Sequence, residues 1–341
     1  MAVGYYSGSS TGPNDLIDKL RIALLAESFT VDDFSAVGAG YRLHVHKTLG
    51  GEVCYFNFRS AIAETGSTLI TEDNYGSSQG TVTGLVINGS TGYDVGQDWD
   101  TQTGYPQNRD NGNKSYGVVM SPMSTSAIPA YYFYFVGNSV HIAVEITAGK
   151  FQFMSFGMLV KEGTITGDWY FTGSLSSYQP SYDYTDRNDV PRYFAHPCLT
   201  NDCVNGAVYI NADGTTNWRM AGYDGSYDEI AFSAPAGVGN EWAYPYYYNS
   251  GMASLFYSYA PNAYNAMAAM CPLYVFLKRS DNNYSQIGYP EGVRCLNVTN
   301  YDPAEEIPYG DETWMVFPQD GVEDDPQNAN LGVAFLKDDG S

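Results

Sequence analysis

The segment AYYFYFVGNSVHIAVEI, residues 130–146, contains an unbroken run of aromatic and apolar residues, Tyr131–Val136. This run is too short to cross a membrane as a helix, which requires roughly 20 apolar residues. Gly137–Ser139 follows it and has the composition of a turn. Tyr131–Val136 is therefore predicted to be a central strand that is buried on both faces or covered by another layer.

Beyond this turn, apolar residues alternate with more polar ones from Val140 to Ile146. This period of two predicts a strand with one buried face. A second turn, Thr147–Lys150, leads into the apolar segment FQFMSFGML, residues 151–159. Together the three segments predict a three-stranded antiparallel meander.

The composition agrees with an all-β chain. Of 341 residues, 16% are charged and 15% are aromatic, with 31 Tyr and 36 Gly, and such a chain favours strands and turns. The predicted fold is mainly β, an antiparallel β-sandwich or meander with one N-terminal α-helix packed on a sheet and long Gly/Asn/Tyr-rich loops. Residues 1–175 would hold the helix, a hairpin and the meander, and residues 176–341 a mainly β region. A single continuous domain is the alternative.

An amphipathic pattern predicts a helix over residues 15–27, capped by Asn14 or Asp15. It should pack on a hairpin whose strands meet at Gly50-Gly51. The predicted core combines residues from the hairpin, the meander and the C-terminal half: Val45, Phe56, Phe58, Phe133, Phe135, Val144, Ile146, Phe153, Val275 and Phe317.

The formal net charge is −22, and Lys and Arg form no cluster. We therefore expect no direct binding to nucleic acid, because such binding needs basic stripes. The N-terminal residues carry no secretory signal pattern, so synthesis in a host cytoplasm without membrane insertion is expected. The five cysteines are then expected to be reduced thiols, with a local bridge between Cys198 and Cys203 as the alternative.

Few residues suggest chemistry. His44 and His46 face the same way on one strand, and with His141 they would offer a metal site, but a solvated strand face is the favoured interpretation. The acidic clusters lack the calcium-loop pattern, no pair of carboxylates stands out as glycosidase-like, and no nucleophile elbow, phosphate loop or dinucleotide fingerprint occurs. We expect no catalytic residue, no cofactor and no metal, and the chain is not expected to be an enzyme.

Two long polar segments, residues 89–129 and 175–190, are predicted to be loops that contact neighbouring molecules. Aromatic residues in these loops and in the Tyr-rich segment near residue 245 would supply the interface, although sugar stacking is an alternative use. The predicted interface residues are Tyr93, Trp99, Tyr105, Tyr182, Tyr184, Trp242, Tyr246 and Tyr247.

Several segments resemble virion structural proteins of tailed bacteriophages, of the tail, baseplate or neck type. The resemblance is carried by the N-terminal helix with GYRLHVHK and YFNFRSAI, by GLVINGSTGYDVGQDWD, by HIAVEITAGKFQFMSFGMLVKEGTITGDWYFTGS, by YSQIGYPEGVRCLNVTNYDPAEEIPYGDETWMVFP and by ANLGVAFLK. It implies a structural role in the virion, with the chain itself and other virion proteins as partners, and it carries over no catalytic residue. A receptor- or carbohydrate-binding phage protein, as in a tail fibre, is the alternative.

Overall fold

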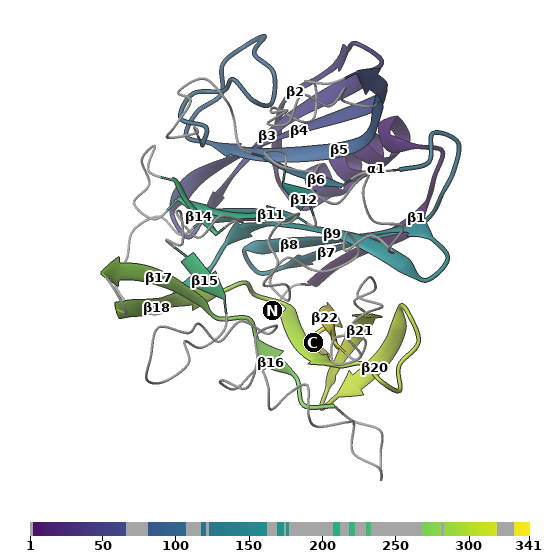
Figure 1. Ribbon diagram of the computed structural model, residues 1–341, viewed down its shortest axis with the longest axis vertical. Coiled ribbons are helices and arrows are strands. Elements are labelled where there is room, and N and C mark those ends of the chain that lie inside the picture. The colour runs from purple at the N-terminus through teal and green to yellow at the C-terminus, as the bar shows by residue number, and fades with distance from the viewer. Residues whose placement is uncertain are drawn as a thin grey trace, which may run out of the picture.

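A computed structural model describes residues 3–65, 81–106, 117–120, 123–161, 169–173, 175–176, 207–211, 218–221, 230–232, 268–280, 283–318 and 331–341. In these ranges the chain is mainly β and its strand pairs are antiparallel, as predicted. Three sheets stack as layers in a sandwich-like arrangement, and a smaller sheet lies beside the lower layers (Figure 1). Within the described residues, no helix has the length and apolar character needed to cross a membrane.

The central sheet contains the predicted meander. Strands β7, β8 and β9 pair in sequence, and β7 lies between β1 and β8, so the prediction of an internal strand is confirmed. In spatial order the central sheet comprises β1 (Val3–Ser10), β7 (Ile128–Val136), β8 (Ser139–Thr147), β9 (Lys150–Met158), β11 (Trp169–Gly173), β13 (Ala207–Asn211) and β14 (Trp218–Ala221).

The upper sheet contains the predicted hairpin. Its two strands pair from Leu49 and Glu52 outward. Gly50 and Gly51 form the turn with φ of 54° and 92°, and positive φ at both central residues is what a type I′ hairpin turn requires. The upper sheet comprises β12 (Leu175–Ser176), β6 (Val118–Met120), β5 (Thr81–Ser90), β4 (Glu52–Thr65), β3 (Gly40–Leu49) and β2 (Thr30–Val37).

The C-terminal part of the chain forms the remaining two sheets. The lower sheet comprises β16 (Cys271–Pro272), β19 (Val293–Asn297), β22 (Leu331–Asp338), β21 (Glu312–Pro318) and β20 (Glu305–Tyr309). The small sheet comprises β10 (Val160–Lys161), β18 (Asn283–Tyr289), β17 (Val275–Ser280) and β15 (Ile230–Phe232). The central sheet takes strands from both sides of residue 175, and β10 joins the small sheet, so hydrogen-bonded ladders link the two regions of the sequence.

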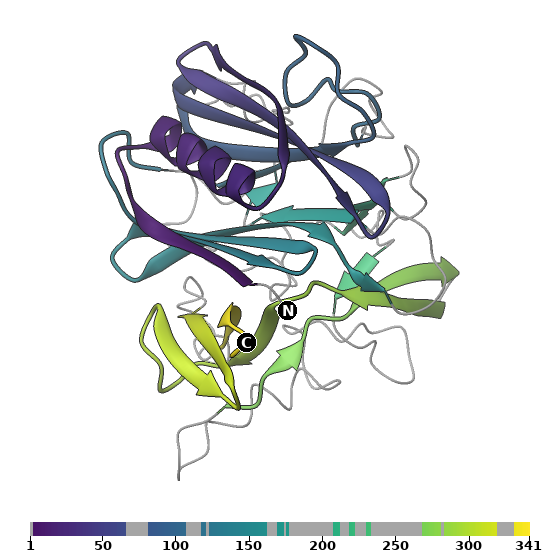
Figure 2. The same ribbon diagram turned by 180° about the vertical axis from the view of Figure 1, so that it is seen from behind.

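Helix α1 (Pro13–Ala26) lies between the upper and central sheets (Figure 2). It packs on β3 and β4, as predicted. The predicted cap is wrong: Gly12 precedes the helix, Pro13 is its first residue and no side chain caps it. Asn14 instead donates a hydrogen bond to the carbonyl of Ala39, which fastens the helix to the β2–β3 turn. Proline fits this first position because its missing N–H would have no partner inside the helix.

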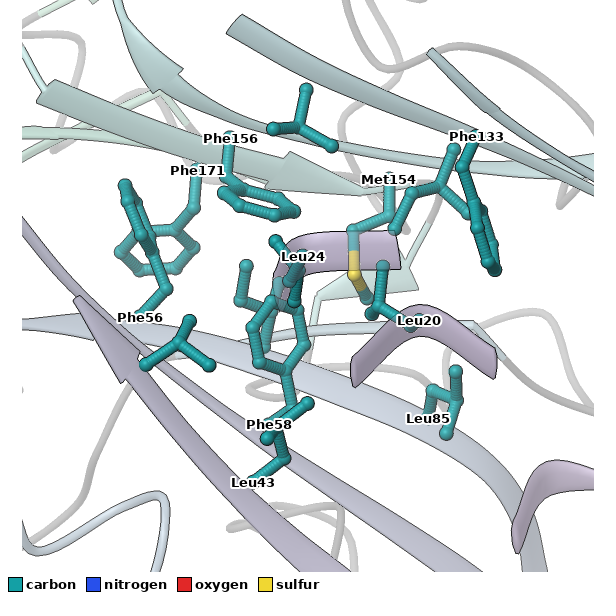
Figure 3. Close-up of a cluster of buried hydrophobic side chains, with 14 of the residues drawn as sticks. Leu20, Leu24, Leu43, Phe56, Phe58, Leu85, Phe133, Met154, Phe156 and Phe171 are labelled. Carbon is teal, nitrogen blue, oxygen red and sulfur yellow. The ribbon is translucent and has the colours of Figure 1, made fainter. Parts of the chain in front are cut away.

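The upper core fills the space between the upper and central sheets (Figure 3). Phe156 of β9 lies at its middle, with ring centroids 4.8 Å from Phe56 and 5.3 Å from Phe58. Leu20 and Leu24 enter from the helix, so the helix, the upper sheet and the central sheet all contribute to one cluster. Their burial follows from the helical spacing of the apolar residues, which places them on one face.

The lower core lies between the central and lower sheets. Phe317 of β21 packs against Phe151 and Phe153 of β9, with centroid separations of 5.0 and 6.0 Å. The hydroxyl of Tyr134 lies 2.9 Å from the sulfur of Met315. The lower sheet thus covers the face of the meander that is turned away from the upper core.

Because the lower sheet covers this face, the prediction for β8 needs a correction. One buried face was predicted, yet Ser139–Val144 are all buried. His141 is accommodated because its Nε2 donates to the carbonyl oxygen of Glu291 and its Nδ1 accepts from the Ser155 hydroxyl at 3.0 Å. Its ring also stacks on Phe335. Of the ten predicted core residues, nine are buried, and Ile146 is partly buried.

The helix offers a matched test of the upper core. Leu24 is fully buried, whereas its neighbour Leu25 is 46% exposed. Leu24→Ala should lower the free energy of unfolding by about 2–5 kcal/mol through lost packing and a residual cavity, and Leu25→Ala should change it by less than about 0.5 kcal/mol. Urea titration of both variants checks this. Equal losses would mean that the helix does not pack as described.

The lower core should make stability depend on pH. Burial, opposed by the hydrogen bond to Glu291, lowers the pKa of His141 to about 4. The unfolded chain binds a proton at the ordinary pKa while the folded chain stays neutral, so acidification favours unfolding between these values. The contribution of His141 should be on the order of 3 kcal/mol, fully present above pH 6.5 and lost as the pH falls to 4.

The measurement is urea unfolding across this pH range for the native chain and for His141→Gln. The carboxylates titrate in both proteins, so the difference between the curves isolates His141. The variant should show a shallower loss of stability on acidification. Parallel curves would contradict the burial of a neutral His141.

Candidate functional site: a tethered loop over a buried polar row

The outer face of the upper sheet carries a row of buried polar residues. Strand alternation turns His44, Asn57 and Asn88 away from the upper core, and the antiparallel register places them side by side on β3, β4 and β5. All three are buried, and His44 is only 1% exposed. We call these three residues the polar row. The segment that contacts this face is the loop after β5, residues 91–106, which we call the tethered loop.

Hydrogen bonds run along the polar row. His44 Nδ1 lies 2.8 Å from Asn57 Oδ1, and Asn57 Nδ2 donates to the Ser90 hydroxyl at 2.9 Å. Asn88 donates to the backbone carbonyl of Trp99 in the tethered loop. Because the amide oxygen accepts, His44 carries its proton on Nδ1. Its Nε2 has no hydrogen-bond partner among the described residues. Burial lowers the pKa of His44, which keeps the ring neutral.

Gln102 holds the tethered loop together from within. This side chain is fully buried. Its Oε1 accepts from the backbone N–H of Asp94 at 2.6 Å, and its Nε2 donates to the carbonyl of Gln97 at 3.1 Å. Asp94 in turn accepts from the backbone N–H and the hydroxyl of Thr103, at 2.7 and 2.5 Å. Because one buried amide satisfies several backbone groups, the loop has a defined conformation.

Two arginines attach the loop to the sheet. Arg42 of β3 donates through Nε to Asp33 at 2.7 Å and through Nη1 to the carbonyl of Gly96 at 2.8 Å. Arg59 of β4 is buried, and its Nε lies 3.5 Å from the carboxylate of Asp98. Arg42 thus joins a strand to the loop by a charge-assisted hydrogen bond, which is the stronger class, and Arg59 does so by an ion pair.

The tip of the loop is its most exposed part. Val95 is 85% exposed. The backbone N–H of Gln97 donates to the carbonyl of Asp94 at 3.2 Å, and Gly96 has φ of 83°. A turn with positive φ at its third residue favours glycine there. Arg42 fixes the same turn from below, so Val95 is an apolar side chain held outward on a rigid support.

Three of the predicted interface residues lie in the tethered loop. Tyr93 and Tyr105 are partly exposed there, and the ring of Tyr93 packs 5.4 Å from that of His44. Trp99 is a correction, because it is 1% exposed and belongs to the interior under the loop. A Cβ on Gly117 would come within 2.5 Å of its ring. The other five, Tyr182, Tyr184, Trp242, Tyr246 and Tyr247, lie outside the described residues.

The three histidines considered for a metal do not converge. His44 belongs to the polar row, His46 pairs with Asp32 at 2.7 Å, and His141 lies in the central sheet. In the part of the chain that the structure describes, no group of three or more His, Cys, Asp or Glu has a metal-binding arrangement. Because the polar row is inaccessible, this site is built to hold a loop rather than to present a reactive group.

Sequence reasoning missed the polar row. The signal was present, since Asn57 and Asn88 interrupt strands that are otherwise apolar or aromatic, and a buried face needs paired polar groups. Alternation alone assigns such residues to solvent. No protein-family model matches this chain, and a search of curated proteins found no match.

Removing the Gln102 amide should loosen the tethered loop. Gln102→Ala removes the acceptor of the Asp94 N–H and one of the two donors to the Gln97 carbonyl, which should cost about 1–3 kcal/mol and speed hydrogen exchange across residues 91–106. Gln97→Ala is the control, because the hydrogen bond that this exposed side chain makes among the described residues is one accepted from the Thr101 hydroxyl. Hydrogen exchange of the two variants is measured by mass spectrometry across the loop. Exchange in Gln102→Ala that equals that of the native chain would contradict the role of the amide.

Proposed function

We propose that this chain is a structural component of a tailed-phage virion, in the tail, baseplate or neck, and that it assembles as a symmetric oligomer. In this role the chain has no catalytic function, and its partners are further copies of itself and other virion proteins. The observation that carries it is the tethered loop, which presents an apolar tip on a preorganised support. A rigid contact loses little conformational entropy on binding.

The free edges of two sheets support contact through loops rather than through added strands. Edge strand β2 carries Asp32 and Asp33, and edge strand β20 carries Glu305, Glu306 and Pro308. Charges and proline on edge strands prevent uncontrolled pairing with other sheets. An assembly of such subunits therefore depends on surfaces outside these edges, and the tip of the tethered loop is one.

The charge of the chain sets a condition on this assembly. Each copy carries a formal charge of −22, so copies repel one another at long range. Contacts in a ring must therefore use surfaces of low charge. The tip meets this condition, because Val95, Gly96 and Gln97 are uncharged. Added salt should strengthen the oligomer by screening the repulsion.

A specific observation also favours a second candidate. Tyr93 and Tyr105 are partly exposed beside the tip, and exposed aromatic rings can stack on sugars. A receptor- or carbohydrate-binding phage protein would use this surface on a host glycan instead of on another subunit.

Light scattering of the purified protein, at low and high salt, tests the proposal. The expected result is a mass that is a fixed multiple of 37.4 kDa. In Val95→Asp the association constant of the oligomer should fall at least tenfold, which corresponds to roughly 1.4 kcal/mol. Val53→Asp is the matched control, since Val53 is 44% exposed on β4. It should leave assembly unchanged.

If Val95→Asp leaves assembly unchanged, the tip is not part of the interface. A monomer at every salt and protein concentration, which also fails to join other virion proteins, would contradict the structural role. Glycan binding by that monomer, lost on Tyr93→Ala, would establish the second candidate.

A further inference from the structure

Two cysteines face each other across the edge of the lower sheet. Strand β16 has two residues, and in its pairing with β19 the partner of Cys271 is Cys295. Both are free thiols. Residues directly opposite in an antiparallel pair point to the same face, with Cα atoms about 4.5–5.5 Å apart. A disulfide requires a Cα separation of roughly 4.4–6.8 Å, so the two thiols meet its backbone requirement.

Pro272 determines which type of pair the cysteines form. Opposite pairs alternate between those that exchange two N–H···O bonds and those that exchange none. Pro272 has no N–H, so its pair with Arg294 is the one without bonds. The Cys271–Cys295 pair then exchanges both bonds and has Cα atoms about 5.5 Å apart, which lies within the range for a disulfide. Formation of the bond brings the two Cβ atoms to about 3.5–4.5 Å from each other.

The two cysteines lie nearer the surface than Cys54 does. Cys271 and Cys295 are both partly exposed, whereas Cys54 is fully buried in the upper core. Arg294 precedes Cys295 and places its guanidinium over the ring of Trp314, 5.1 Å from the centroid. Burial, and then Cys271, raise the pKa of Cys295 to about 12. Thiolate is therefore scarce at neutral pH, and exchange should be slow there.

We propose that Cys271 and Cys295 form a reversible dithiol–disulfide site that takes a small disulfide, of the oxidised glutathione class, as its oxidant. The Cys271 thiolate attacks the small disulfide, which breaks its S–S bond and releases one glutathione thiolate. The Cys295 thiolate then attacks the Cys271 sulfur of the mixed disulfide and expels the second. Two protein thiols are oxidised to one disulfide, and the two protons that they lose pass through water to the two glutathione thiolates, which become thiols.

The bond would lock the chain onto the lower core. Ala268, Met270 and Leu273 flank or adjoin β16 and pack against the lower core. A two-residue strand gives this segment few backbone hydrogen bonds. A covalent bond to β19 would hold it in place and close the chain between residues 271 and 295, which restricts the unfolded state.

The experiment treats the full chain with oxidised glutathione at alkaline pH, alkylates the remaining thiols and digests with trypsin without reduction. Trypsin cuts after Lys278, Arg279 and Arg294, so the two cysteines share a fragment only if they are bonded. We expect a linked pair lighter than the sum of its peptides by two hydrogen atoms. We also expect a melting temperature several degrees higher than that of the reduced chain, reversed by dithiothreitol.

Two variants separate this site from the other thiols. Cys198→Ser should keep both the linked fragment and the melting shift, and Cys271→Ser should lose both. The proposal is overturned if Cys295 remains alkylated after Cys271 has been fully oxidised, or if Cys271 is found bonded to Cys198 or Cys203.

Discussion

The architecture depends on the double-sided burial of strand β7. Its residues alternate between two cores: Phe133 and Phe135 enter the upper core, and Tyr134 and Val136 enter the lower one. A shift of one residue in register would exchange these two sets. The upper core needs a ring at residue 135 that packs on Tyr6 and Phe29, and the lower core needs a tyrosine at residue 134 whose hydroxyl reaches Met315. Both outer layers therefore hold the register of the meander.

The burial of β8 follows from the same constraint and explains its polar residues. His141 pairs with Tyr134 across the ladder and faces the lower core. A neutral histidine is tolerated there because both ring nitrogens have partners and the ring stacks on Phe335. The upper sheet uses the same principle on its outer face, where the polar row is buried and hydrogen-bonded. In both places buried polar groups specify which segment packs against a sheet.

The sequence predicted the elements that carry strong local signals. The meander, the Gly50-Gly51 hairpin and nearly all of the proposed core are confirmed, because turn chemistry and apolar periodicity are local properties. Strands β1 and β2 were missed, since β1 is rich in Gly and Ser and β2 carries two adjacent aspartates. The pairing of β1 is decided by a long-range partner, Tyr131–Val136. Strand β2 forms a local hairpin with β3 across residues 38–39, and its adjacent aspartates hid the apolar alternation that would have revealed it.

The errors have a common physical origin. Alternation describes one strand, whereas burial depends on what other parts of the chain lie over it. Nothing local to β8 reveals the lower sheet, and nothing local to Trp99 reveals that its loop folds back onto the polar row. The helix cap was wrong for a related reason, because Asn14 binds Ala39 in another element instead of the helix terminus. The cysteine pair is also invisible locally, since its two members come from different strands.

Hydrogen exchange of the native protein tests the central claim most directly. If β7 and β8 are covered on both faces, the hydrogen-bonded amides in residues 131–136 and 139–144 exchange only when the whole chain unfolds. Their exchange should be the slowest in the protein, and its free energy should equal that of global unfolding. Exchange as fast as in edge strand β20 would show that the lower sheet does not cover the meander and would contradict the three-layer arrangement.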